Sequence, residues 1–228
     1  MTPELVVIGD AHLWHGDCRE VMGQLALPNA ALLTDPPYGL ADLWQGGGGS
    51  KRTSWRFDPD EAAGWDGATV DAVLKMAESF REAVVWGGNY YALPPRRCWL
   101  LWDKKQNDNW TTGQAEMAWT NLDRPVRVFR FAQCEQASEG PKLHPTQKPL
   151  ALMAWCLKWL TAPAIVDPFM GSGTTGVACA LHRRQFVGIE RDRKYFDIAC
   201  ERIAAAQAQG SLLDEPAVMQ GEQQGLAL

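Results

Sequence analysis

The sequence lacks the features that mark membrane, secreted and metal-binding proteins. No stretch approaches the run of about 18 apolar residues that a membrane span needs, and the amino terminus has no basic region followed by an apolar one. The six cysteines occur singly, without a Cys-x-x-Cys pair, so we expect reduced core residues and no disulfide frame or zinc site. His12 and His15 fall in an expected strand, where they would face opposite ways. A cytoplasmic protein without a metal is therefore expected.

Positive charge is scarce as well. The chain carries 22 Lys and Arg against 27 Asp and Glu, a net charge of −5. This balance argues against a nucleic-acid partner, but phosphate binding depends on where positive charge is placed and the net value does not exclude it. Local basic clusters do occur, and one of them combines Lys51, Arg52 and Arg56 with the aromatic side chain of Trp55. For a single cluster of this kind, a solvated surface remains an equally good interpretation.

What the chain does contain is typical of a soluble α/β domain. It has 228 residues, of which 46% are hydrophobic and 21% charged, enough for one full core. Strand patterns alternate with helix patterns, which favours a sheet with helices on both faces. We expect a single domain over residues 1–209 and a polar, flexible tail over 210–228.

Two stretches far apart in the chain carry most of the chemical information. The first is Asp35-Pro36-Pro37-Tyr38, which follows the short apolar segment 30–34. That segment predicts a buried strand with Asp35 at its carboxyl end, where open α/β sheets bind ligands. Two successive prolines fix φ at both positions, so the tetrapeptide is stiff. An Asp-Pro pair alone would indicate only a turn.

The second stretch, Asp-Pro-Phe-Met-Gly-Ser-Gly-Thr-Thr, runs from Asp167 to Thr175. It predicts a strand over 164–167, a tight glycine turn over 171–173, and an alanine-rich helix from Thr174 to about His182.

This stretch is compatible with two kinds of nucleotide site. A further strand over 185–190 ends in Glu190, which completes a dinucleotide-binding pattern with three glycines. They are Gly171, Gly173 and Gly176. A nicotinamide-dependent oxidoreductase is therefore an open alternative. Asp167 weighs against it, because an acid before the turn repels a pyrophosphate and attracts an ammonium group.

Together and in this order, the two stretches resemble the DNA amino-methyltransferases of the permuted β class. The resemblance implies a Rossmann-like, S-adenosylmethionine-dependent methyltransferase fold, circularly permuted, with a mostly parallel seven-stranded sheet. It implies methylation of an exocyclic base nitrogen in DNA by base flipping, and a homodimer. Adenine N6 is favoured because cytosine-N4 enzymes more often carry Ser in place of Asp35. Cytosine N4 remains the alternative within the family, and a catalytically idle DNA-binding protein is a third possibility.

The tetrapeptide fits this chemistry residue by residue. The lone pair of an exocyclic amino nitrogen is delocalised into the ring, so two acceptors for its hydrogens are needed to relocalise it. Asp35 supplies a carboxylate and Pro36 a carbonyl, while Tyr38 can stack on the base. The resemblance makes Asp35, Pro36, Pro37 and Tyr38 the catalytic residues.

The resemblance also implies a set of cofactor-binding residues for S-adenosylmethionine. Besides Asp35 they are Asp17, Thr146, Gln147, Lys148, Asp167, Phe169, Gly171, Ser172, Gly173, Thr174 and Glu190. Glycines in the turn would keep Cβ atoms away from the cofactor. Some members of the set have simpler explanations. Asp17 would cap a helix over 18–24, and Thr146 with Pro149 would begin a helix over 150–160.

DNA-binding residues are expected in three places. Lys51, Arg52 and Arg56 follow a glycine run inside a mobile loop at about 40–57. Asn89 follows Gly87-Gly88, where the family lines its base pocket and where a plain turn is an equal alternative. The segment at about 131–143 occupies the place of a target-recognition domain. It is very short, which predicts weak sequence specificity.

Overall fold

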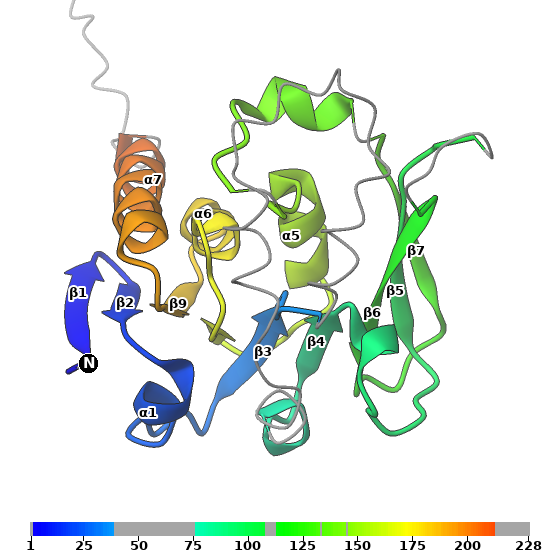
Figure 1. The fold of residues 1–228 in the computed structure, drawn as a ribbon, viewed down its shortest axis with the longest axis horizontal. Helices are drawn as coiled ribbons and strands as arrows, with labels where there is room; N and C mark the ends of the chain where they lie inside the picture. The colour runs from blue at the N-terminus through cyan, green and yellow to red at the C-terminus, as the bar shows by residue number, and fades with distance from the viewer. Residues whose placement is uncertain (1, 39–75, 108–112, 133, 145, 213–228) are drawn as a thin grey trace, which may run out of the picture.

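The computed structural model describes residues 2–38, 76–107, 113–132, 134–144 and 146–212. They form one nine-stranded sheet with helices on both faces (Figure 1). The amino-terminal half contains β1 (Glu4–Ile8), β2 (Ala11–His15), α1 (Cys18–Met22), β3 (Ala30–Thr34), β4 (Ala83–Trp86), the 3-10 helix η1 (Gly88–Tyr90) and β5 (Trp99–Asp103). The remaining elements are β6 (Ala115–Thr120), β7 (Arg127–Arg130), the 3-10 helix η2 (Glu135–Glu139), α5 (Leu150–Leu157), β8 (Ala164–Asp167), α6 (Thr174–Leu181), β9 (Gln185–Glu190) and α7 (Arg193–Leu212).

The strand order is β1-β2-β9-β8-β3-β4-β6-β5-β7. Five neighbouring pairs are parallel and three are antiparallel, so the expected mostly parallel sheet is confirmed. The expected count of seven strands is wrong, because β1 and β7 extend the sheet at its two edges. Each is short and only partly buried, so neither gives the periodic signal of a core strand. The circular permutation remains a prediction.

The core has two layers, one on each face of the sheet. Successive residues of a strand point to opposite faces, and in β3 Leu33 joins one buried cluster while Leu32 joins the other. The first cluster is completed by α5, α6 and α7, which lie together on one side in Figure 1. The second is completed by residues next to α1 and by a short helical stretch at 76–79 on the opposite side.

Most sequence-predicted elements are confirmed, and the differences lie at their ends. The strands predicted at 30–34, 164–167 and 185–190 are β3, β8 and β9, and α6 begins at Thr174 as expected. α1 and α5 are shorter than predicted. Pro149 is the N-cap of α5, with φ −59° and ψ 139°, so it precedes the first helical residue. α7 continues to Leu212, past the predicted start of the tail.

Further expectations concerned cysteine, histidine, metal and membrane. All six thiols are free, but Cys134 is exposed, so it is not the core residue that was expected. In β2, His12 is exposed and His15 is buried, which confirms their opposite orientation. Within the described residues no cluster of three or more His, Cys, Asp or Glu could hold a metal ion. No helix in the same residues is long and apolar enough to cross a bilayer.

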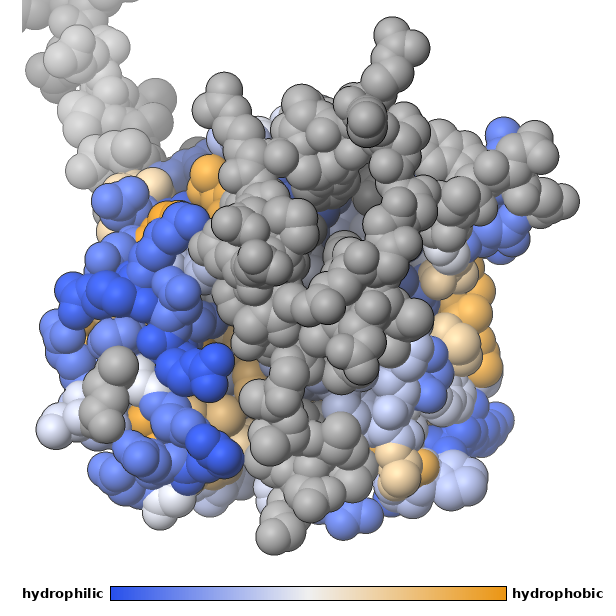
Figure 2. Space-filling view, viewed as in Figure 1, coloured by the Kyte–Doolittle hydropathy of each residue, from blue (hydrophilic) through white to orange (hydrophobic). Residues whose placement is uncertain are grey.

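One edge of the sheet carries apolar surface. Val128 of β7 and Val126 just before it are 42% and 47% exposed, and Figure 2 shows apolar colour over the β7 edge of the molecule. The opposite edge strand, β1, exposes Leu5 and Val7. Unpaired edge strands of this kind can join a further strand.

Candidate active site

Four acids lie at the carboxyl ends of four successive strands. β2, β9, β8 and β3 are parallel neighbours in the sheet, so their carboxyl ends share one edge. Asp17 follows β2, Glu190 ends β9, Asp167 ends β8 and Asp35 follows β3. This edge is the place where open α/β sheets bind ligands, and the sequence-predicted acids are brought together there.

Asp35 is held by two side chains. Its Oδ1 accepts a hydrogen bond from the Tyr38 hydroxyl at 2.5 Å, and its Oδ2 accepts one from Lys148 Nζ at 2.5 Å. Lys148 Nζ also lies 2.9 Å from the Tyr38 hydroxyl oxygen. The ammonium of Lys148 is part of the Asp35 cluster, 113 residues away in the chain, and its contact with a cofactor remains a prediction.

Two further charged residues complete this cluster. Glu116 Oε2 lies 3.2 Å from Lys148 Nζ, an ion pair without a well-directed hydrogen bond. Glu116 Oε1 lies 2.7 Å from Lys104 Nζ. Side-chain exposure is 7% for Lys148, 10% for Lys104 and 27% for Glu116. The result is a chain of alternating charges that begins at Asp35 and ends at Lys104.

Sheet topology explains why these residues meet. β6 runs antiparallel to β4 with Trp86 opposite Ala118, so Glu116 lies just beyond the carboxyl end of β4. Glu116 pairs with Trp102 of β5, which puts Lys104 at the same end. Lys148 reaches this edge from the segment before α5.

Tyr38 fits against a glycine. Gly87 has φ +67°, and a Cβ at this position would lie 2.1 Å from the Tyr38 ring. The ring also stacks on that of Tyr90, with centroids 5.1 Å apart and planes 24° apart. The Tyr91 hydroxyl donates to the Pro37 carbonyl. Gly87 therefore makes room for Tyr38, and the tetrapeptide is fixed at both of its last two residues.

The protonation of the cluster follows from burial and charge. Burial raises the pKa of the Asp35 carboxyl, the Lys148 ammonium opposes this rise and the Glu116 carboxylate adds to it. Burial would lower the pKa of Lys148, but the two carboxylates around it raise the value. Partial burial would raise the pKa of Glu116, yet Lys148 and Lys104 bring it down to about 2. Glu116 is therefore ionised, and Asp35 is the weaker acid of the two.

Asp167 is held differently. Its Oδ1 accepts hydrogen bonds from the Thr34 hydroxyl at 2.8 Å and the Phe169 amide at 3.2 Å. Its Oδ2 accepts one from the Thr175 hydroxyl at 2.7 Å. The residue is 3% exposed, and burial raises its pKa to about 6. These bonds join β8 to β3 and to the start of α6.

Glu190 fixes the glycine turn. Its Oε2 accepts a hydrogen bond from the Gly171 amide at 2.9 Å, and its Oε1 accepts one from the Asp192 amide at 2.7 Å. Burial raises the pKa of Glu190 to about 7. Arg202 of α7 donates to the Ser172 carbonyl and, at 3.3 Å, to the Thr174 hydroxyl. The turn is thus tied to β9 and to α7.

The three glycines of this stretch differ in how closely other residues pack against them. A Cβ on Gly173 would lie 2.8 Å from Ala199 of α7, and one on Gly176 would lie 2.4 Å from Ile203. Gly171 has φ +51°, and a Cβ there would meet only the His144 ring, at 3.6 Å or more. The dinucleotide-like spacing therefore has a packing explanation at Gly173 and Gly176, whereas Gly171 leaves space on the turn.

The segment before α5 is locally bonded. The Thr146 amide and hydroxyl lie 3.3 and 3.1 Å from His144 Nδ1. Gln147 Oε1 accepts hydrogen bonds from the Leu143 amide and, at 3.3 Å, from the Ser172 hydroxyl. Gln147 is thus brought to the glycine turn. The exposed Thr146 has its local partner within its own loop.

The remaining predicted residues lie apart from the Asp35 cluster. Asp17 caps α1 by accepting from the Arg19 amide, as predicted, and also pairs with the Arg19 guanidinium. The pairing lowers the pKa of Asp17 to about 2. Asn89 is exposed in η1 next to Tyr90. Lys51, Arg52, Arg56 and the loop at about 40–57 lie outside the described residues.

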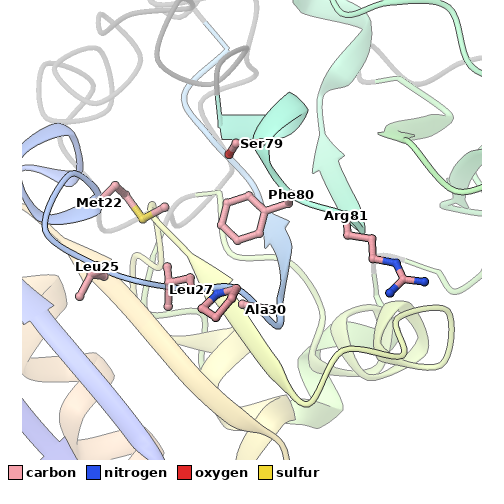
Figure 3. Close-up of a pocket in the computed structure, with 8 residues that line it drawn as sticks. Met22, Leu25, Leu27, Ala30, Ser79, Phe80 and Arg81 are labelled. Atoms are coloured by element: carbon pink, nitrogen blue, oxygen red, sulfur yellow. The ribbon is translucent and has the colours of Figure 1, made fainter.

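A pocket of about 260 Å³ opens at the other end of β3 (Figure 3). It is lined largely by apolar side chains, including Met22, Leu27 and Phe80, and the charged end of Arg81 extends away from them. The pocket lies at the amino end of β3 and contains no acid, so it is not the chemical site.

Sequence reasoning missed Glu116 and Lys104. Neither belongs to a motif, since Glu116 is a single acid inside the strand Ala-Glu-Met-Ala-Trp-Thr. An acid in an otherwise apolar strand was the one available signal, because such a group needs a partner when it is buried.

Comparison with known proteins finds similarity to one family in part of the chain. Residues 96–201 match the model of the N6/N4 methyltransferase family, described as DNA methylase. Type II methyltransferase M.HinfI of Haemophilus influenzae is 34% identical over 113 residues, which cover 46% of this chain and 32% of that protein. Type II methyltransferase M2.MboI of Moraxella bovis is 43% identical over 112 residues, covering 46% of this chain and 40% of that protein.

Solved structures agree on the fold. The M1.HpyAVI complex with SAM has a TM-score of 0.54 at 22% identity and covers 85% of this chain and 99% of its own. PvuII DNA methyltransferase, titled cytosine-N4-specific, has a TM-score of 0.56 at 14% identity and covers 86% and 87%. At these identities the likeness is one of fold. By the family match over 96–201 and the two relatives in sequence, this part of the chain is similar to the DNA amino-methyltransferase family.

Proposed function

We propose that the protein transfers a methyl group from S-adenosylmethionine to the exocyclic N6 of adenine in DNA. The observation that carries this proposal is the Asp35 cluster at the carboxyl end of β3, next to a row of three further acids. The family match supports the reaction class. The chain spans only 32–40% of the length of the two sequence relatives, so the proposal rests on the site itself.

The acidic row fits the chemistry of the cofactor. S-adenosylmethionine carries a positive sulfonium and a positive ammonium group, which carboxylates attract. We assign Glu190 to the ribose hydroxyls, Asp17 to the adenine ring and Asp167 to the ammonium, with Gly171 giving space on the turn. Gln147 adjoins the turn through Ser172. When bound, the cofactor supplies an electrophilic methyl group.

Asp35 activates the amino nitrogen in this proposal. A carboxylate offers about four lone-pair positions, of which Tyr38 and Lys148 use one each. Asp35 can therefore still accept an amino hydrogen, which returns the nitrogen lone pair to the attacking position. As the nitrogen takes the methyl group, the S–CH3 bond of the sulfonium would break to leave a neutral thioether, and Asp35 would accept the proton that the nitrogen loses. An adenine inside a duplex cannot reach Asp35, so the base must be flipped.

The choice of adenine rests on the carboxylate at the head of the tetrapeptide. Incubation with labelled cofactor and mixed-sequence DNA, followed by nucleoside analysis, tests it. We expect labelled N6-methyladenine from the wild type and from Asp123→Ala, whose side chain is 90% exposed, but none from Asp35→Ala. Labelled N4-methylcytosine would overturn the base assignment. Absence of any labelled nucleoside would overturn the proposed function.

DNA binding is proposed to be loose and salt-sensitive. Base readout needs side chains delivered into a groove, and the segment at 131–143 is short. Affinity must then come mainly from phosphate contacts, which weaken steeply as salt rises. A Lys51→Ala/Arg52→Ala double variant should lose affinity equally on all sequences. Methylome sequencing that found one fully modified site of six or more base pairs would contradict weak specificity.

A further inference from the structure

The ammonium of Lys148 lies between two carboxylates with different surroundings. Asp35 faces the open edge of the sheet and is 20% exposed, and its Oδ2 lies 2.5 Å from Nζ. Glu116 lies on the far side at 3.2 Å and has a second cation, Lys104, at 2.7 Å. Glu116 therefore remains charged whatever Asp35 does, and it competes with Asp35 for Lys148.

We propose that Lys148 and Glu116 form an opposed pair that positions and tunes Asp35: Lys148 keeps the carboxylate ionised and oriented, and Glu116 limits how far Lys148 suppresses its basicity. This deepens the proposed function and rests on it. An acceptor of amino hydrogens must be ionised and must also retain proton affinity. Lys148 without Glu116 would keep Asp35 ionised but would lower its proton affinity. The negative charge of Glu116 partly offsets the effect of the ammonium and so restores the proton affinity of Asp35.

Lys148 and Glu116 should shift the pKa of Asp35 in opposite directions. An opposite charge within about 4–6 Å lowers the pKa of a carboxyl group by about 1–3 units, and a like charge raises it. Loss of the Lys148 charge should therefore raise the pKa of Asp35, and loss of the Glu116 charge should lower it. A residue that only fills space would not produce opposite shifts in the two variants.

Other titratable groups around Asp35 have smaller effects. Tyr38 donates to Asp35 as a neutral phenol, and burial raises its pKa well above the usual range. Asp167 of β8 adds a like charge, and Lys142 adds a positive one near Lys148. None of these groups changes in the Lys148 and Glu116 variants, so each contributes equally to the comparison.

The test is a carboxyl-carbon NMR titration of protein labelled with ¹³C at the aspartate side chain, without cofactor or DNA. The Asp35 signal is assigned by its loss in Asp35→Asn. In Lys148→Met its titration midpoint should rise by about 1–3 pH units, and in Glu116→Gln it should fall. Lys148→Arg should restore the wild-type midpoint to within about one unit. Lys158→Met, which makes the same substitution at an exposed lysine, should leave the midpoint unchanged.

Glu116→Gln keeps nearly the same shape, so it decides the matter even if Lys148→Met does not fold. A midpoint that stays in place or rises in Glu116→Gln would overturn the proposal. Single-turnover rates against pH provide a second readout, in which the acid limb should move with the NMR midpoint. The titration midpoints could move in opposite directions in the two variants while the wild type methylates no DNA. That result would support the opposed pair and would overturn only the proposed function.

Discussion

Asp35 and Asp167 stand at the carboxyl ends of the adjacent strands β3 and β8, yet their surroundings differ. Asp35 is partly exposed and is paired with an ammonium group. Asp167 is nearly inaccessible and accepts its hydrogen bonds from two hydroxyls and one amide. Burial raises both pKa values, but only Asp35 has a counter-charge that another acid also attracts.

In the proposed function, this difference separates a reactive acid from one that also stabilises the fold. Neutral donors orient Asp167 and join three elements, so its removal should affect stability first. An ammonium holds Asp35 without joining strands, so its removal should affect chemistry first. The following substitutions test this distinction, beginning with the largest expected effect.

Asp35→Ala should reduce single-turnover methyl transfer by about 100-fold or more, because positioning and proton acceptance are each worth effects of that size. Calorimetric affinity for S-adenosylhomocysteine should stay within a few fold, since the carboxylate faces the base in the proposed site. Retention of more than about a tenth of the wild-type rate would contradict the role assigned to Asp35.

Asp167→Ala should lower the free energy of unfolding by about 3 kcal/mol, because two hydroxyls and one amide lose their acceptor in the core. Urea denaturation measures the change. Asp167→Asn is the matched control, since its carbonyl oxygen and amide can replace most of these bonds without charge. If Asn preserves stability but weakens affinity for S-adenosylhomocysteine by about 1.5–3 kcal/mol, the carboxylate also binds the cofactor. Unchanged stability in Asp167→Ala would remove the structural role.

Glu190→Gln should change how stability depends on pH. The folded-state pKa of about 7 lies above the ordinary value of 4.5, so the folded protein binds more protons than the unfolded chain in this interval. Stability should fall as pH rises from about 4.5 to about 7 and level off above, by about 3 kcal/mol in all. The Gln variant should lack this slope, whereas the exposed Glu20→Gln should keep it. If stability depended on pH equally in the wild type and in Glu190→Gln, the pKa of Glu190 would not be raised by burial.

Glu139→Ala should cost about 1 kcal/mol of stability through loss of a helix cap. Pro149 cannot cap α5 with its side chain, and the Glu139 carboxylate accepts from the Leu150 and Ala151 amides at 2.7 and 2.8 Å. Thermal unfolding measures the change, with the exposed Glu201→Ala on α7 as control. An equal melting temperature for wild type and Glu139→Ala would mean that water replaces the cap without loss.

Local patterns carried much of the fold and part of the site. β3, β8 and β9 are short and apolar, and each ends in or just before an acid, so their positions and the edge they share could be predicted. The tight turn after β8 was equally clear from its glycines. Such features depend on neighbours in the chain, and local sequence reports them directly.

The rest depends on pairing between distant segments. Lys148 meets Asp35 only because the segment before α5 crosses the carboxyl end of β3, and the position of Glu116 follows from the register of β6 against β4. No short sequence motif predicts either of these placements. The edge strands β1 and β7 were not predicted, because the expected count of seven strands came from the resemblance and not from the sequence pattern of each strand. Gly87 was expected to line a base pocket or to form a plain turn, and its close contact with the Tyr38 ring was not predicted.

The row of four acids has a consequence for the order in which ligands arrive. Arg19 and Lys148 offset the charge of two carboxyl groups in this row, and the negative potential of those that remain ionised repels a polyanion approaching that edge. A small cation that settles among Asp17, Glu190 and Asp167 screens most of this potential from within. DNA would then meet an edge already neutralised, so the cofactor should bind first and make the later approach of the nucleic acid faster.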